Sequence, residues 1–318
     1  MLGLVSAALG VPYALLIRIA VSGDAGTDSL VLLILKFTII LVIAFVPLYK
    51  FVRDHFSIFK KSFKNLCIMV ICNVISSSFW IMSVEQSNAS YASIVMLLAP
   101  IVLVILSAKL VKDRMTRRAA AGISLAAVGG ILVVALPALL QGSAISDVYP
   151  LATILLLINC IANPLVIVFQ RRSHEQGVPL TALVGLVALV AVPVLSAIYI
   201  GMHGGDAMIN AMSNLSWQVW VAALYSGLII SFAARNLAAR SYEHTGAAVR
   251  GGLTYLETLL SVVLPIIVLG EHLSIEMMVG ALLILVGVFL AESGSKHHFL
   301  KLGFKRHPRY FHRHGRFR

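Results

Sequence analysis

Ten long apolar runs succeed one another along the 318-residue chain, and they constrain its fold more than any other feature. The runs cover, to within a few residues, 2-22, 29-50, 65-82, 89-108, 118-138, 149-170, 178-200, 217-240, 246-269 and 275-292. A helix needs about 20 apolar residues to cross the hydrocarbon core of a bilayer. The runs are too long for membrane strands and lack two-residue alternation, which excludes an outer-membrane barrel. The sequence therefore predicts an all-α integral membrane protein with ten transmembrane helices.

Basic residues gather in alternate loops and in the C-terminal tail. They follow the second, fourth and sixth runs and the end of the eighth, as with Lys60, Arg117 and Arg171. The intervening loops contain no Lys or Arg at 23-28, 83-88, 139-148, 201-216 and 270-274. Because Lys and Arg favour cytoplasmic loops, we expect both termini in the cytoplasm and a multi-pass protein of the inner, cytoplasmic membrane. This partition accounts for most of the formal charge of +12.

Several function classes are disfavoured by the motifs that the sequence lacks. It has no Walker loop, HExxH, GxSxG or EF-hand pattern, which argues against an ATP-driven pump, a motif-bearing enzyme or a bound cofactor. Cys67, Cys72 and Cys160 lie in apolar runs without CxxC spacing, so we expect neither a disulfide framework nor a zinc site. The first 22 residues lack a basic n-region and carry Arg18, which favours a retained span over a signal peptide.

Residues 293-318 form a polar tail that holds eight Lys or Arg and five His. Aromatic residues interleaved with basic ones can bind single-stranded nucleic acid. A disordered cytoplasmic segment lying on anionic lipid explains the same composition more simply. We therefore expect the lipid bilayer, rather than nucleic acid, to be the partner of the tail.

A shift of 158 residues aligns the two halves of the chain. The aligned pairs are 83-89 (SVEQSNA) with 241-247 (SYEHTGA), Asp113 with Glu271, Thr116 with Ser274, Gly122 with Gly280 and Gly129 with Gly287. Each half holds five runs, so the second copy should cross the membrane in the opposite sense. Inverted repeats allow two bundles to expose a midplane site to each side in turn, although channels use them as well.

On these residues the chain resembles the drug/metabolite transporter superfamily, specifically its ten-span EamA-type carriers. In the family pattern, an acidic residue is followed by Thr or Ser and then by two glycines seven residues apart. Pro100 opens the first copy, whereas Thr258 replaces the expected proline in the second. The resemblance implies two inverted five-helix repeats, at 1-143 and 149-292, and a transporter rather than an enzyme. It also implies a homodimer through helices 5 and 10.

Physical reasons for the repeated motif are visible in its residues. Thr116 and Ser274 precede apolar runs, where a hydroxyl can cap the free amides of a helix. The glycines share a helix face that permits close helix contact in lipid. We expect Asp113 and Glu271 to link their spans to the next helix.

Ionisable residues inside the spans are the first candidates for the transport site, because a charge at the bilayer centre costs about 2.5 to 3.5 kcal/mol. Glu257 lies near the middle of a span, where it could bind a proton or a substrate amine. Arg250, two turns before it, and Lys36 are candidate cations, although the first could reach the interface and the second could be structural. We expect Arg18, close to the end of its span, to reach the interface.

Polar and aromatic residues in other spans could complete the site. The candidates are Asn73, Trp80, Tyr91, Asn159, Asn163 and Tyr255, any of which could instead pack between helices. Pro12 and Pro164 should each disturb a span, because proline removes one helix hydrogen bond.

Together these features predict a secondary transporter that exports small polar metabolites, such as amino acids, by alternating access. Glu257 is the predicted proton-coupling residue. One alternative is an exchanger of phosphorylated or nucleotide-linked organic anions, motivated by Lys36 and Arg250. Another, from a different class, is a membrane scaffold or receptor that acts through the basic tail.

Overall fold

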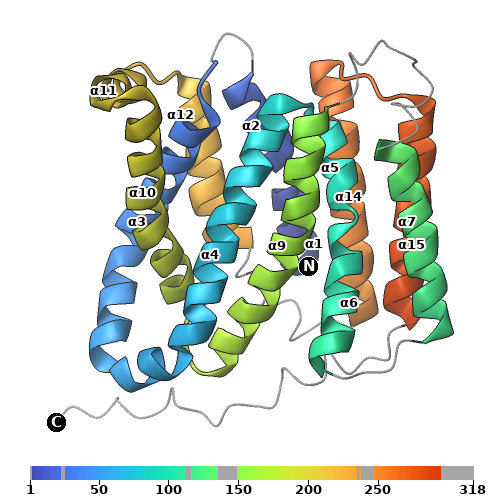
Figure 1. Cartoon of the computed structure of the whole chain (residues 1–318), viewed down its shortest axis with the longest axis horizontal. Coiled ribbons are helices and arrows are strands. Elements are labelled where there is room, and N and C mark those ends of the chain that lie inside the picture. Colours follow the sequence, from blue (N-terminus) through green and yellow to red (C-terminus); the bar gives the residue numbers. More distant parts are fainter. Residues whose placement is uncertain are drawn as a thin grey trace.

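The computed structural model describes residues 2–22, 26–111, 116–134, 149–234, 237 and 247–294. Every regular element in these ranges is helical, and the helices stand side by side in one bundle (Figure 1). Six helices of the described residues are long and apolar enough to cross a membrane: Leu4–Val21, Ser29–Asp54, Phe56–Gln86, Pro150–Glu175, Leu180–His203 and Trp217–Ala234. Shorter apolar helices occupy Ala89–Leu103, Ala120–Val133, Glu257–Leu269 and Ile275–Ala291. The predicted all-helical membrane class is confirmed.

The first apolar run is divided into α1 (Leu2–Gly10) and α2 (Tyr13–Val21). Val11 and Pro12 form a turn between the two helices, since proline has no amide hydrogen with which to continue the ladder. The predicted disturbance at Pro12 is confirmed. At Pro164, by contrast, α9 (Pro150–Glu175) continues without a break.

Two segments predicted as loops are helical instead. α3 (Ser29–Asp54) and α4 (Phe56–Gln86) are separated only by His55, so the basic segment between the second and third runs lies on helix ends. α11 (Gly205–Ser213) occupies most of the predicted loop 201-216. Hydropathy underestimates α3 and α4 because their ends are polar. It misses α11 because that helix is short and partly polar.

The rest of the first half comprises α5 (Ala89–Met96), α6 (Ala99–Val111) and α7 (Arg117–Val134). Asn88 caps α5, because its Oδ1 accepts a hydrogen bond of 2.9 Å from the Tyr91 amide. In the second half, α9 is followed by α10 (Leu180–His203), α12 (Trp217–Leu224), η2 (Tyr225–Ala234), α14 (Ala247–Leu269) and α15 (Ile275–Gly294). η2 is a π-helix that continues α12, and such segments are frequent at functional sites.

Glycines bring α7 and α15 together at one end of the bundle (Figure 1). A Cβ atom added to Gly287 would lie 2.6 Å from the Gly122 carbonyl oxygen, and one added to Gly129 would lie 2.6 Å from the Gly280 carbonyl oxygen. Because the pairs run in opposite directions, the helices are antiparallel. The predicted close contact between glycine faces is confirmed within one chain. The homodimer stays a prediction, and it would have to use other faces of α7 and α15 because their glycine faces already contact each other.

Several further helix pairs join the two halves of the chain, and four of them matter for the repeat. α3 packs on α10, α4 on α9, α5 on α14, and α2 on α12. Fully buried apolar residues such as Leu32, Leu156 and Leu183 fill the space between the helices. The interface between the halves therefore runs through the middle of the bundle, where the candidate site residues lie.

Candidate functional site

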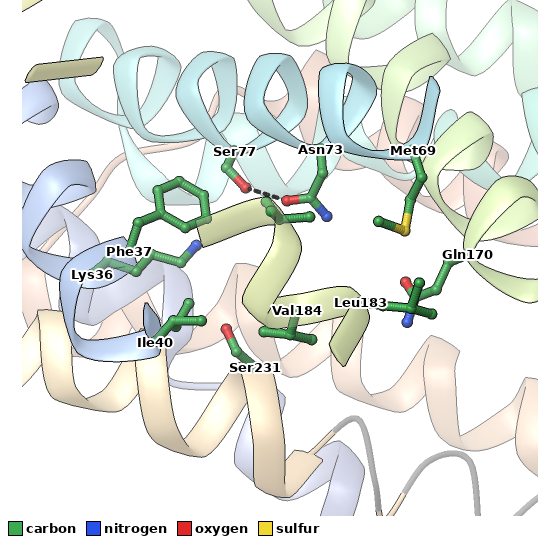
Figure 2. A pocket seen from close by; sticks show the side chains of 11 residues that line it. Lys36, Phe37, Ile40, Met69, Asn73, Ser77, Gln170, Leu183, Val184 and Ser231 are labelled. Atoms are coloured by element: carbon green, nitrogen blue, oxygen red, sulfur yellow. Dashed lines mark hydrogen bonds between the residues drawn. The ribbon is translucent and has the colours of Figure 1, made fainter. Parts of the chain in front are cut away.

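A small cavity of about 30 Å³ lies between α3, α4, α9, α10 and η2. Its lining residues, shown in Figure 2, are Lys36, Phe37, Ile40, Met69, Asn73, Ser77, Gln170, Leu183, Val184, Val187 and Ser231. α3 and α4 belong to the first half of the chain and the other elements to the second. The cavity therefore lies at the interface between the halves.

Lys36 supplies a positive charge to this cavity. Its side chain is only 7% exposed and extends from α3 toward the space beside α4 (Figure 2). The ammonium Nζ donates a hydrogen bond of 3.5 Å to the Tyr13 hydroxyl and lies 5.8 Å from the centre of that ring. It also lies 5.3 Å from the ring centre of Phe37. Cation–π contacts of this kind stabilise a charge away from water.

One face of α4 carries three of the polar groups near this cation. Ser77 donates a hydrogen bond of 3.4 Å to the Asn73 Oδ1, and the Asn73 amide nitrogen is directed toward the cavity (Figure 2). Trp80 stacks on Tyr13 with ring centres 6.2 Å apart. Its indole Nε1 is buried and has no hydrogen-bond partner among the described residues. Such a buried donor is costly unless something binds to it.

Glu257 lies against the break in the first apolar run. A Cβ atom on Gly10 would overlap the Glu257 carboxylate, so the helices can approach this closely only because residue 10 is glycine. Tyr225, the first residue of η2, donates a hydrogen bond of 2.7 Å to the Leu9 carbonyl beside the break. Tyr13, which contacts Lys36, follows Gly10 by three residues. The broken helix thus connects the surroundings of Glu257 with the cavity.

The other two candidates on α14 are placed only by their backbone. Arg250 precedes Glu257 by seven residues, which corresponds to about 10 Å along a helix. Tyr255 lies in the same helix. The side chains of both residues lie outside the described part of the structure.

The remaining candidates lie where α9 meets α4 and α5. Asn159 is 1% exposed; its Oδ1 accepts a hydrogen bond of 2.7 Å from Ser76. Tyr91 is also buried, and its hydroxyl shares a hydrogen bond of 2.6 Å with the Thr153 hydroxyl. Asn163 is half-buried, one turn beyond Asn159 on α9. The structure thus places Lys36 and Trp80 against Tyr13, places Lys36 and Asn73 in one cavity lining, and places Asn159 and Tyr91 in helix contacts outside that lining.

Glu271 joins the two halves of the chain at one end of the bundle. Its two carboxylate oxygens accept hydrogen bonds from the amides of Ala89, at 2.9 Å, and Ser90, at 2.8 Å, in the first turn of α5. A carboxylate at this position is favoured by the partial positive charge of a helix N-terminus. Ser90 also donates a hydrogen bond of 3.0 Å to the Val262 carbonyl of α14. We call these contacts between Glu271, Ala89 and Ser90 the latch.

One expectation about this end of the bundle was wrong. Glu271 was expected to link its span to the next helix, but it caps α5 in the other half. Arg18 lies at this same end, where its Nη1 donates hydrogen bonds to the carbonyls of Val84, at 2.8 Å, and Glu85, at 3.1 Å; its reach to the membrane interface stays a prediction. Free carbonyls at the end of α4 offer Arg18 partners within reach. The predicted cap at Ser274 is confirmed, since its hydroxyl accepts a hydrogen bond of 3.3 Å from the Met277 amide.

Some contributors to the site did not stand out in the sequence. Tyr13, Gln170 and Ser231 are common residue types near span ends or on apolar segments, and their spacing gave no signal of a shared cavity. Asp113 and the basic tail beyond residue 294 lie outside the described residues.

Comparison with known proteins identifies the family. Residues 1–135 and 150–292 each match the model of the EamA-like transporter family. The chain belongs to this family. The resemblance inferred from the repeated motif is therefore confirmed, and the chain is a multi-pass membrane protein of a transporter family.

Other comparisons with this EamA-family protein add only to the description of its fold. A search of curated proteins finds no match. A solved structure, described as the crystal structure of a protein, superposes with a TM-score of 0.56 at 17% sequence identity. The alignment covers 92% of this chain and 97% of that one. At this identity the likeness supports the fold and says nothing of the substrate.

Proposed function

We propose that this EamA-family protein is a secondary transporter that exports small polar metabolites, such as amino acids, by alternating access. The observation that carries the proposal is the position of Glu257 on α14, against the break between α1 and α2 and so at a contact between the two halves of the chain. In this proposal the protein lies in the cytoplasmic membrane with both termini in the cytoplasm. The basic residues of alternate loops support that orientation.

The pairing of helices supports two inverted repeats, at 1-143 and 149-292, followed by the tail at 293-318. When the helices are grouped into ten spans, three spans of the first repeat pack on the equivalent spans of the second. These pairs are α3 with α10, α5 with α14 and α7 with α15. The packing of α4 on α9 has its equivalent in that of α12 on α2. This is the pattern expected of an approximate two-fold axis in the membrane plane.

Protonation of Glu257 would couple export to proton entry. A carboxylate within a span is costly when charged, so it favours either a proton or a cationic substrate group as its partner. Competition between the two for one carboxylate would link proton movement to substrate movement in opposite directions. The adjoining break in α1 and α2 offers backbone groups that can rearrange as the halves move.

The latch would keep the predicted outer side closed while the site faces the cytoplasm. It lies at the end of the bundle that holds the acidic loops 83-88 and 270-274. Two charge-assisted hydrogen bonds and the helix dipole act at this one contact between the repeats. Opening the outer side would require both hydrogen bonds to break.

Transport by Glu257→Gln in proteoliposomes tests the coupling. We expect uptake of radiolabelled amino acids driven by a pH gradient in the wild type, and its loss in the variant. Glu175→Gln is the matched control, because Glu175 is 46% exposed and pairs with Arg171 at 3.0 Å on the surface of the same bundle. Retained pH-driven uptake by Glu257→Gln would refute the proposed role.

Two alternatives have their own tests. The buried Lys36 leaves open an exchanger of phosphorylated or nucleotide-linked anions, and competition between anionic and zwitterionic compounds distinguishes that function. A scaffold or receptor that acts through its tail would lose all activity on deletion of residues 295-318, with the bundle still folded. A transporter would keep its uptake.

A further inference from the structure

Exposed aromatic and basic side chains gather where α3 turns back into α4, at the predicted cytoplasmic end of the bundle (Figure 1). His55 alone separates the two helices, and α3 packs against α4. Three aromatic rings in this segment are each more than half exposed, and the basic side chains beside them in the sequence are exposed as well. The aromatic residues are Tyr49, Phe56 and Phe63, and the basic residues are Lys50, Arg53, Lys60, Lys61 and Lys64. We call this surface the α3–α4 patch.

On α4 most of the patch occupies one side of the helix. Its members there stand at positions i, i+4, i+7 and i+8, which share one side of an α-helix. They are Phe56, Lys60, Phe63 and Lys64. A different side of α4, which carries Ser62 and Leu66, is buried in the bundle. Aromatic rings and ammonium groups therefore alternate along an exposed surface, an arrangement typical of the boundary between lipid and water.

The positive charge of the patch has little compensation within this segment. Asp54 is the one acidic residue between Tyr49 and Lys64, and Arg53 pairs with it at 2.8 Å. Lys60 and Lys64 lie one turn apart, where like charges repel each other. They also follow the N-terminus of α4, which has no acidic residue in its first turn, although the start of a helix favours negative charge. An anion beside the two lysines would lower both electrostatic costs.

The aromatic part of the patch favours a lipid over a soluble anion. A free phosphate could pair with the lysines, but it would leave the rings of Phe56 and Phe63 in water. On α3 the Arg53 guanidinium lies 5.9 Å from the centre of the Tyr49 ring, so a charge and a ring are combined there as well. The preceding turns of α3 expose further apolar side chains, namely those of Val42, Phe45 and Val46. α3 thus continues the patch with an apolar surface that acyl chains can cover.

We propose that the α3–α4 patch binds an anionic phospholipid of the cytoplasmic leaflet. The lysines of α4 contact its phosphate, and the exposed phenylalanine rings lie among its glycerol and acyl groups. This inference goes beyond the proposed function and depends on no transport step. The site adjoins a contact between the two halves of the chain, because Asn65 donates a hydrogen bond of 3.2 Å to the side-chain oxygen of Gln176. A bound lipid would hold α4 beside this contact.

Native mass spectrometry of the purified full chain in detergent measures the binding, with phosphatidylglycerol as the anionic probe and phosphatidylcholine as the neutral one. We expect phosphatidylglycerol to bind more tightly. Lys60→Gln combined with Lys64→Gln should weaken its binding roughly twenty-five-fold, because each basic residue near an anionic lipid contributes a factor of about five. Phosphatidylcholine binding should not change. Arg117→Gln combined with Arg118→Gln is the matched control, since it removes two exposed cations from the start of α7, on the other side of the bundle (Figure 1), and should leave the affinity unchanged.

Phe63→Ser tests the aromatic part of the patch and provides a second variant in case the double lysine variant does not fold. It should weaken phosphatidylglycerol binding although it removes no charge, and an unchanged affinity would overturn the proposal. Excess glycerol 3-phosphate should not displace the lipid; full displacement would show that a free phosphate suffices. Equal binding of the two lipids would also overturn the proposal. So would equal weakening by the lysine and arginine pairs, because a general attraction between positive charge and anionic lipid would then explain the binding.

Discussion

Replacement of Glu271 by glutamine should weaken the latch at a single point. The glutamine oxygen can still accept one of the two amide hydrogens in α5, but its NH₂ group would face the other, so either Ala89 or Ser90 loses its acceptor. The negative charge at the helix N-terminus is lost as well. Hydrogen bonds to charged groups contribute about 1.5–3 kcal/mol each, so we expect the closed state to lose about 2 kcal/mol. That corresponds to a roughly thirtyfold rise in the open population.

Thiol labelling from the predicted outer side measures this opening. Ser93 is a suitable reporter, because it is 4% exposed on α5, close to the latch, and its hydroxyl has no hydrogen-bond partner in the described part of the chain. In a background without native cysteines, we expect Ser93→Cys to react with a membrane-impermeant maleimide up to about thirtyfold faster when Glu271→Gln is added. Glu276→Gln, five residues away, is the control and should leave the rate unchanged. An unchanged rate in Glu271→Gln would refute the role of the latch.

Two further substitutions test the packing of the bundle, with tryptophan fluorescence during thermal unfolding in detergent as the measurement. Gly287→Ala should lower the melting temperature, because the new Cβ would lie 2.6 Å from the Gly122 carbonyl oxygen; such overpacking costs about 1–3 kcal/mol. Gly201→Ala, where a Cβ would meet nothing within 4 Å, should not lower it, and equal melting of the two variants would contradict the close helix contact. Asn159→Ala should also lower the melting temperature, because the Ser76 hydroxyl loses its acceptor, at a cost of about 1–3 kcal/mol; an unchanged value would show that this bond does not stabilise the fold.

The glycine motif shows what the sequence can and cannot predict about helix packing. Its spacing predicted a close helix contact, and the repeat aligned Gly122 with Gly280 and Gly129 with Gly287. In the structure Gly122 packs against Gly287 and Gly129 against Gly280. Symmetry-related residues and contacting residues are thus different pairs, because the two helices cross in an antiparallel arrangement. A linear alignment reveals the repeat but not the crossing.

Candidate site residues could be predicted from the sequence where their side chains are costly to bury in a membrane. Lys36 and Asn73 stood out because charged and amide groups are rare within spans, and they line one cavity. Ser231 and Tyr13 did not stand out, because hydroxyl groups and tyrosine are tolerated in many spans. The π-helix that presents Ser231 depends on hydrogen-bond geometry rather than composition. Contacts across the chain, such as those of Glu271 and Arg18, likewise depend on tertiary packing.

Labelling of one cavity residue from both sides of the membrane tests alternating access most directly. Ser77→Cys, in the background without native cysteines, places a thiol in the cavity between the halves of the chain. We expect an impermeant maleimide to reach it from either side, and Glu271→Gln to raise the rate from the predicted outer side while lowering the rate from the cytoplasm. Rates that rise together on both sides would indicate a continuous pore, and a thiol reached from one side only in both backgrounds would contradict alternating access.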